Sequence, residues 1–109
     1  MYVKQASINA LAITDTNAHN GSAVHLDPGG TLYAALFTNL LNQNCSFQVQ
    51  GAMDADGPWF NVGSAVSVTA ADDYGYATFT EPWPWVRVRA TAASAPTSGT
   101  VSADIVRFK

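Results

Sequence analysis

Alternation of apolar and polar residues with a period of two recurs along this chain, and it limits the folds that the chain can adopt. Successive side chains of a β-strand point to opposite faces, so this period predicts strands with one buried and one solvated face. In WVRVRA at 85–90, two valines and an alanine share one face, whereas a tryptophan and two arginines share the other. Similar alternation marks 45–50, 66–69 and 101–106. Each segment is typical of a half-buried antiparallel strand.

Short segments rich in Gly, Asp, Asn and Pro separate these strands and predict turns. We expect strands near 7–13, 22–27, 31–38, 44–53, 58–62, 65–70, 75–80, 85–92 and 99–108. The segment 31–38 is predicted to be buried on both faces and to lead into a loop, with a helical turn near 38–43 as the alternative. The whole pattern predicts an all-β fold, an antiparallel β-sandwich of jelly-roll type with about eight strands. Residues 21–109 are expected to form this single domain, after an N-terminal arm or first strand at 1–20.

Composition argues against several classes of function. The chain has 109 residues, which suits one domain, and only 12% of them are charged, about half of the ~25% usual for soluble domains. A net charge of −3 without a concentrated basic patch argues against binding to DNA or RNA. No stretch approaches the ~20 apolar residues of a membrane helix. The first residues lack the pattern of a signal peptide, so we expect synthesis in a cytoplasm.

The residues that most often carry chemistry are few and scattered. Cys45 is the single cysteine and lies in an alternating segment, so we interpret it as a small buried hydrophobe. His19 and His25 flank an Asn-Gly turn but have no Cys or carboxylate nearby in the sequence to complete a metal site. The Asp-Ala-Asp-Gly segment at 54–57 is typical of a hairpin turn, and the Asp pair at 72–73 of a solvated loop. We therefore predict no catalytic residues, no metal and no cofactor.

The segment EPWPWVRVRA at 81–90 concentrates bulk and positive charge. Its two prolines fix φ and lack N–H donors, so strand pairing can begin only after them. Trp85, Arg87 and Arg89 then share one strand face, where guanidinium groups can pack on indole. One interpretation is a structural corner or an interface with another protein. The other is a sugar-binding face, because exposed tryptophans stack on sugar rings and arginine binds hydroxyls or carboxylates.

The run from 47 to 90 has a recognisable order of motifs. A strand ends in V-x-G-x-x-D-x-D-G at 49–57, W-F-x-V-G follows at 59–63, and then come a strand, a Tyr-rich loop and an aromatic-Val-Arg-Val strand. This order resembles small β-sandwich domains of phage virion proteins, including capsid decoration (cement) and tail-associated proteins. Discoidin-like and carbohydrate-binding sandwiches have a similar hairpin. The resemblance covers about residues 44–107.

The resemblance implies a non-enzymatic virion accessory protein, often trimeric in such families. We expect a phage capsid decoration protein that stabilises the shell through contacts with itself, as a homotrimer, and with the major capsid protein. It would lie on the capsid surface of the virion. A carbohydrate-binding or tail-associated recognition module is the alternative. Aromatic and arginine residues dominate interface energetics, so the expected partner-binding residues lie on the face and in the arm: Trp83, Trp85, Arg87, Arg89, Tyr2, Val3 and Ile8.

Overall fold

The computed structural model describes residues 2–26, 32–70 and 72–108, and these form strands and connecting loops without a helix. The strands are β1 (Tyr2–Leu11), β2 (His19–Asn20), β3 (Val24–His25), β4 (Leu32–Asn39), β5 (Cys45–Ala52), β6 (Phe60–Asn61), β7 (Val66–Val68), β8 (Asp73–Phe79), β9 (Trp85–Ala92) and β10 (Val101–Phe108). The predicted all-β fold is confirmed. Accordingly, the described chain contains no helix long and apolar enough to cross a membrane.

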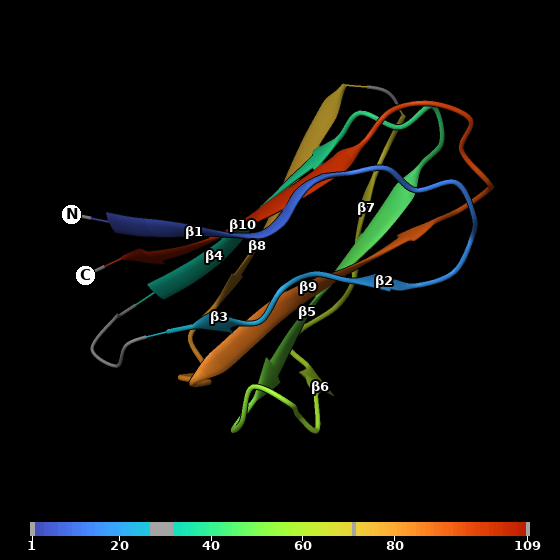
Figure 1. Cartoon of the computed structure of the whole chain (residues 1–109). Helices are drawn as coiled ribbons and strands as arrows, with labels where there is room; N and C mark the ends of the chain where they lie inside the picture. The colour runs from blue at the N-terminus through green and yellow to red at the C-terminus, as the bar shows by residue number, and fades with distance from the viewer. Residues whose placement is uncertain (1, 27–31, 71, 109) are drawn as a thin grey trace.

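The strands form two antiparallel sheets that face each other (Figure 1). Sheet A has the order β1-β10-β4-β8, and sheet B has the order β2-β9-β5-β6, with β3 also paired to β9 and β7 to β5. In each sheet a late strand lies between two early ones: β10 between β1 and β4, and β9 between β2 and β5. Neighbours that are this far apart in sequence define a jelly-roll sandwich, as predicted.

The core lies between the sheets, and one aromatic pair spans its centre. The rings of Phe37 on β4 and Phe47 on β5 stack with centroids 4.7 Å apart and planes 7° apart. Both side chains are almost completely buried. Their inward neighbours on β9 and β10 are small or branched: Val86, Val88, Ala90, Val101, Ala103 and Ile105. The alternation seen in the sequence therefore corresponds to an inner face and an outer face on every long strand.

Three differences from the predicted elements have physical causes. The first strand begins at Tyr2 rather than near residue 7, because its polar beginning pairs with the end of β10. The predicted strand at 22–27 is replaced by β2 and β3, which flank Gly21; a Cβ on that glycine would overlap the Ser7 hydroxyl. Burial of 31–38 on both faces was wrong at Leu32 and Leu36, which are exposed on the outer face of sheet A.

A β-bulge in β1 links the two sheets. The register with β10 shifts between Ala6 and Ile8, so that Ser7 and Ile8 are both buried. The Ser7 hydroxyl donates to the Ser22 carbonyl at 2.8 Å and accepts from the Val88 N–H of β9 at 3.1 Å. One buried side chain of sheet A therefore satisfies a carbonyl in the connection between β2 and β3 and an N–H of the central strand β9.

The turn at 54–57 takes the predicted form. The Gly57 N–H donates to the Asp54 carbonyl at 3.0 Å, and Gly57 has a φ of 88°. Glycine adopts this left-handed conformation without the penalty that a Cβ imposes. The turn carries the chain from β5 into the loop that holds Trp59.

Asn39, the last residue of β4, makes a second polar link between the sheets. Its amide is completely buried and donates to the carbonyls of Gln43, Val68 and Thr69 at 3.0–3.2 Å. Its Oδ1 accepts from the Leu41 N–H at 3.1 Å. A buried amide with all these partners fixes both the loop after β4 and the end of β7.

Replacing Asn39 with Asp tests this link. The substitution keeps the size and the acceptor for Leu41, but it removes the donor that three carbonyl oxygens share and places a carboxyl group among them. We expect the free energy of unfolding to fall by about 3 kcal/mol or more, measured by urea denaturation. Asn42→Asp is the matched control, because Asn42 is exposed and its Oδ1 still accepts from Thr97. Equal losses in the two variants would contradict the role of Asn39.

Candidate binding surfaces

The predicted face on β9 exists, and it is the outer face of sheet B. Trp85, Arg87 and Arg89 are half-buried there and alternate with fully buried residues of the same strand. Across the sheet, Arg87 lies opposite Gln50 and Arg89 opposite Gln48 on β5. Trp85 and the two arginines are therefore brought together as the period of two predicted. Their role in binding a partner stays a prediction.

Each arginine of this face is held by an amide side chain. Arg87 Nε donates to Gln50 Oε1 at 2.9 Å, and its Cζ lies 4.3 Å from the centroid of the Trp59 ring. Arg89 Nε donates to Asn20 Oδ1 at 2.9 Å. The sequence suggested stacking on the indole within the same strand, whereas the indole under Arg87 comes from the loop after β5. Only the path of that loop reveals this contact.

Trp83 does not lie on the same surface as Trp85. Its indole covers Gly51, where a Cβ would overlap the ring, and it stacks on Phe60 with centroids 5.8 Å apart. Its Nε1 donates to a Glu81 carboxylate oxygen at 2.7 Å. Trp85 instead contacts the ring of His25 on β3, with centroids 4.8 Å apart. Trp83 thus closes one end of the sandwich, and Trp85 faces outward from it.

The residues expected to form an N-terminal arm lie in β1. Tyr2 and Val3 pair with Phe108 and Arg107 at the end of β10. Ile8 is 4% exposed and packs in the core. In this fold, the Ile8 side chain is directed into its own domain and is not presented to a partner.

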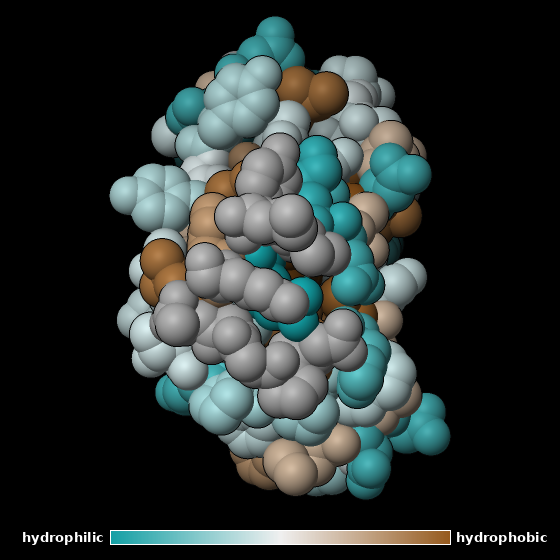
Figure 2. Space-filling view, turned by 90° about the vertical axis from the view of Figure 1, so that its left-hand side faces the viewer, coloured by the Kyte–Doolittle hydropathy of each residue, from teal (hydrophilic) through white to brown (hydrophobic). Residues whose placement is uncertain are grey.

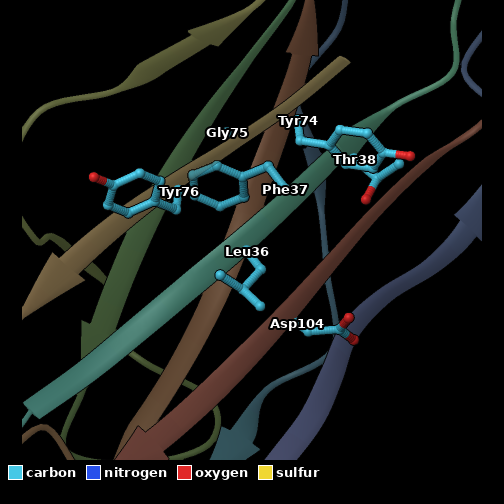
Figure 3. Close-up of a pocket in the computed structure, with 7 residues that line it drawn as sticks. All are labelled: Leu36, Phe37, Thr38, Tyr74, Gly75, Tyr76 and Asp104. Carbon is cyan, nitrogen blue, oxygen red and sulfur yellow. The ribbon is translucent and has the colours of Figure 1, made fainter. Parts of the chain in front are cut away.

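A second surface, on the outer face of sheet A, was missed by the analysis of the sequence. Leu36, Tyr74 and Tyr76 are 43%, 72% and 68% exposed. With Thr38 and Asp104 they line a hollow of about 350 Å³. Figure 3 shows the two tyrosines on β8 on either side of Gly75, Leu36 and Thr38 on β4, and Asp104 on β10. The sequence of β4 has apolar residues on both faces and so predicts burial of both, but in the structure Leu32 and Leu36 on the outer face are exposed.

The apolar character of this face continues toward β1. Leu36 also borders an adjoining hollow of about 280 Å³ with Lys4, Val106 and Phe108. Leu32 pairs with Phe108 across the strands, and both are more than a third exposed. The end of the molecule seen in Figure 2 mixes hydrophilic and hydrophobic residues instead. On the outer face of sheet A, exposed leucine, tyrosine and phenylalanine side chains thus extend from β8 to β10.

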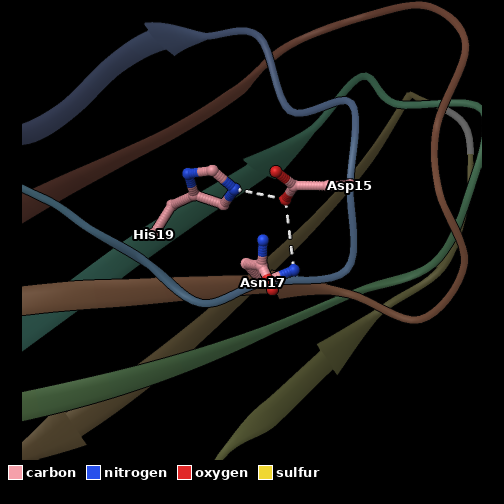
Figure 4. A network of polar contacts seen from close by, with 3 residues as sticks. All are labelled: Asp15, Asn17 and His19. Carbon is pink, nitrogen blue, oxygen red and sulfur yellow. Dashed lines mark hydrogen bonds and ion pairs between the residues drawn. The ribbon is translucent and has the colours of Figure 1, made fainter.

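His19 has the carboxylate partner that the sequence did not reveal. Its Nε2 lies 2.7 Å from Asp15 Oδ1, which also accepts from the Asn17 N–H at 3.1 Å (Figure 4). The hydrogen bond to His19 is the main reason that the pKa of Asp15 is lowered. His25 pairs with Trp85, five residues along β9 from the partner of His19, so the two histidines are not brought together. Among the described residues, no group of three or more His, Cys, Asp or Glu side chains is placed to hold a metal.

Comparisons with known proteins show a shared fold. No protein-family model matches the sequence, and no curated protein matches it significantly. Among solved structures, PBSX exported protein XepA aligns over 97% of this chain with a TM-score of 0.72 and 12% identity. This chain spans only 37% of XepA. At identities this low, the likeness defines the architecture alone.

Two further structures share the sandwich. SPBc2 prophage-derived protein YomS has a TM-score of 0.57 and 9% identity, covering 98% of this chain and 92% of its own. A protein of Bacillus endospore appendages, which form disulfide-linked pili, has a TM-score of 0.54 and 12% identity, covering 99% and 88%. The class defined by fold and surface is thus a jelly-roll sandwich with two unlike outer faces.

The buried position of Cys45 predicts an unreactive thiol. Cys45 is 1% exposed, and burial raises its pKa from 9.0 to about 11. The reactive thiolate is therefore about a hundredfold scarcer at pH 8 than in an unfolded chain. We expect reaction with a disulfide reagent at pH 8 to be at least about a hundredfold slower in the native protein than in urea. Equal rates in the two states would show that the thiol is accessible.

Proposed function

We propose that this protein is a non-enzymatic structural component of a phage particle that works by packing against other protein subunits. The particular role that we favour is capsid decoration, in which the protein sits on the outside of the shell and stabilises it. The observation that carries the proposal is the exposed apolar outer face of sheet A. Its partners would be further copies of the chain, as a trimer, and the major capsid protein.

The composition of this face supports a contact with protein. Across the strands, Leu36 lies between Asp104 on β10 and Tyr76 on β8. Four strands about 4.8 Å apart, with about seven paired residues each, form a face of about 450 Å². The exposed leucine, tyrosine and phenylalanine side chains occupy part of this area, and exposed apolar patches of a few hundred Å² are often functional. Exposed tyrosine and leucine on a rigid sheet can bury area at a low entropic cost.

The charges of the chain favour association. Only 12% of the residues are charged and the net charge is −3, so repulsion between copies is weak. The outer face of sheet A carries one charge of each sign beside its hollows: Lys4 on the edge strand β1 and Asp104 on β10. In a symmetric assembly, Lys4 of one copy can pair with Asp104 of the next. The same face thus offers apolar area and a charge pair that fixes orientation.

The shared fold supports a particle role without specifying it. YomS is prophage-derived, and the endospore appendage protein belongs to pili, which are assemblies of protein subunits. A jelly-roll domain with paired inner strands and a free outer face suits repeated packing on a lattice, where many weak contacts add up. Location on a capsid surface is the form of this role that we propose.

The assembly is tested by substituting one residue at the centre of the face. We expect wild-type protein to form a closed oligomer, a trimer, in size exclusion with light scattering. Leu36→Lys places a charge in the contact between copies and should shift the mass to that of a monomer. The monomer should stay folded, because Leu36 is exposed and lies opposite Asp104. Met53→Lys is the matched control, because Met53 is also an exposed hydrophobe but follows β5 in sheet B. It should leave the oligomer intact.

A second experiment measures the stability of the shell. Wild-type protein added to particles of its phage should raise the temperature at which they release DNA, and Leu36→Lys should lose this effect while Met53→Lys keeps it. A wild-type monomer at all concentrations, combined with no effect on particles, would contradict the structural role. Equal loss in both variants would contradict the assignment to sheet A.

A further inference from the structure

Two positive charges lie side by side on the outer face of sheet B, and no carboxylate of the described residues pairs with them. Arg87 and Arg89 alternate on β9, which places their Cα atoms about 7 Å apart on the same face. Among the described residues, neither guanidinium lies within ion-pair distance of a carboxylate. Carboxylates are not scarce in the sequence, which has eight acidic residues and five basic ones. The pair is therefore left for something outside the described chain to neutralise.

Neutral amide side chains fix the orientation of both guanidinium groups. Each donates through Nε to an amide oxygen, Gln50 for Arg87 and Asn20 for Arg89, at 2.9 Å. Gln50 is itself buried, and its Nε2 donates to Asn61 at 3.0 Å. In these contacts the Nη groups are not used. A guanidinium with a fixed Nε and available Nη donors is suited to bidentate binding of a carboxylate.

The electrostatics of the pair favour an anion. Burial, followed by the charge of Arg89, lowers the pKa of Arg87 from its ordinary value. Both causes mean that the cation is less stable here than in water. The Trp59 ring, 4.3 Å from Arg87 Cζ, offsets part of this cost by cation–π attraction. A bound anion would remove the repulsion between the two arginines.

We propose that the outer face of sheet B around Arg87 and Arg89 binds a carboxylated saccharide. The carboxylate binds the Nη groups of the arginines. A hydroxyl group can donate to Oε1 of Gln48, which lies opposite Arg89 and whose Nε2 already donates to the carbonyls of Val49, Val62 and Gly63. The indole of Trp85 is partly exposed beside the His25 ring and offers an apolar surface for the sugar ring.

The position of the site favours a saccharide over an acidic peptide. An extended peptide gains affinity from main-chain hydrogen bonds at an open sheet edge. β9 and β5 are central strands, since β9 pairs with β5, β2 and β3, and β5 pairs with β9, β6 and β7. Recognition above them depends on side chains alone. Guanidinium, amide and indole groups satisfy a carboxylated sugar without any contribution from the backbone.

This inference goes beyond the structural role and uses the opposite face of the sandwich. The probes are trigalacturonate and sialyllactose, with lactose as the neutral sugar and hexaglutamate as the acidic peptide. Binding is measured by calorimetry and by tryptophan fluorescence, which Trp59 and Trp85 should report. We expect saturable binding of at least one carboxylated sugar, weakened by salt, and no binding of lactose.

Matched variants separate the site from net charge. Arg87→Met and Arg89→Met should each weaken binding of the carboxylated sugar about tenfold or more, since each removes charged hydrogen bonds. Ser98→Glu changes the net charge by the same amount at an exposed position in the loop before β10, and it should leave the affinity unchanged. Arg89→Lys keeps the charge and the fold but loses the guanidinium fork, so it should weaken binding severalfold. Circular dichroism and urea denaturation check that each variant is folded.

Three results would overturn the proposal. One is the absence of binding of both carboxylated sugars by the wild-type protein. Another is equal weakening by Ser98→Glu, which would indicate attraction by net charge alone. The third is tighter binding of hexaglutamate than of either sugar, which would indicate an acidic peptide as the ligand. Because Leu36→Lys leaves sheet B unchanged, this experiment can fail while the assembly test succeeds, and the reverse.

Discussion

The stacked rings of Phe37 and Phe47 connect the two sheets at the centre of the core, and the direction of their neighbours depends on them. They join β4 of sheet A to β5 of sheet B at the centre of the core. Because side chains alternate along a strand, fixing these two residues inward also fixes which neighbours point outward. On β4 these are Leu36 and Thr38, and on β5 they include Gln48. Both candidate surfaces therefore follow from one inward-facing aromatic pair.

The two outer faces differ because their strands carry different residues at the outward positions. Sheet A presents exposed leucine, tyrosine and phenylalanine side chains, with Lys4, Thr38 and Asp104 among them. Sheet B presents arginine and amide side chains that bond to one another. An apolar sheet face favours contact with another apolar surface, whereas fixed polar groups favour a ligand with matching charge. A jelly roll can thus place assembly and recognition on opposite sides of one core.

Much of this could be predicted from the sequence, because the period of two is a local property. It identified β5, β9 and β10 to within a few residues and placed Trp85, Arg87 and Arg89 on one face. It failed where the outcome depends on contacts between distant segments. The apolar run of β4 reads as buried on both faces, and only the absence of a covering layer leaves Leu36 exposed. The burial of Ser7 depends on a bulge, and the Arg87–Trp59 contact on the path of a loop.

In the segment EPWPWVRVRA, Trp83 packs against the core, whereas Trp85, Arg87 and Arg89 lie on the outer face of sheet B. Trp83 lies over Gly51 and stacks on Phe60, so its indole closes the end of the sandwich. From Trp85 onward the strand is central and paired on both sides. A central strand cannot shift to accommodate its outer side chains, so Arg87 and Arg89 are held near each other by the sheet itself. Neutral amides orient the two guanidinium groups without cancelling their charge. Positive charges kept in this arrangement are what binding an anion requires.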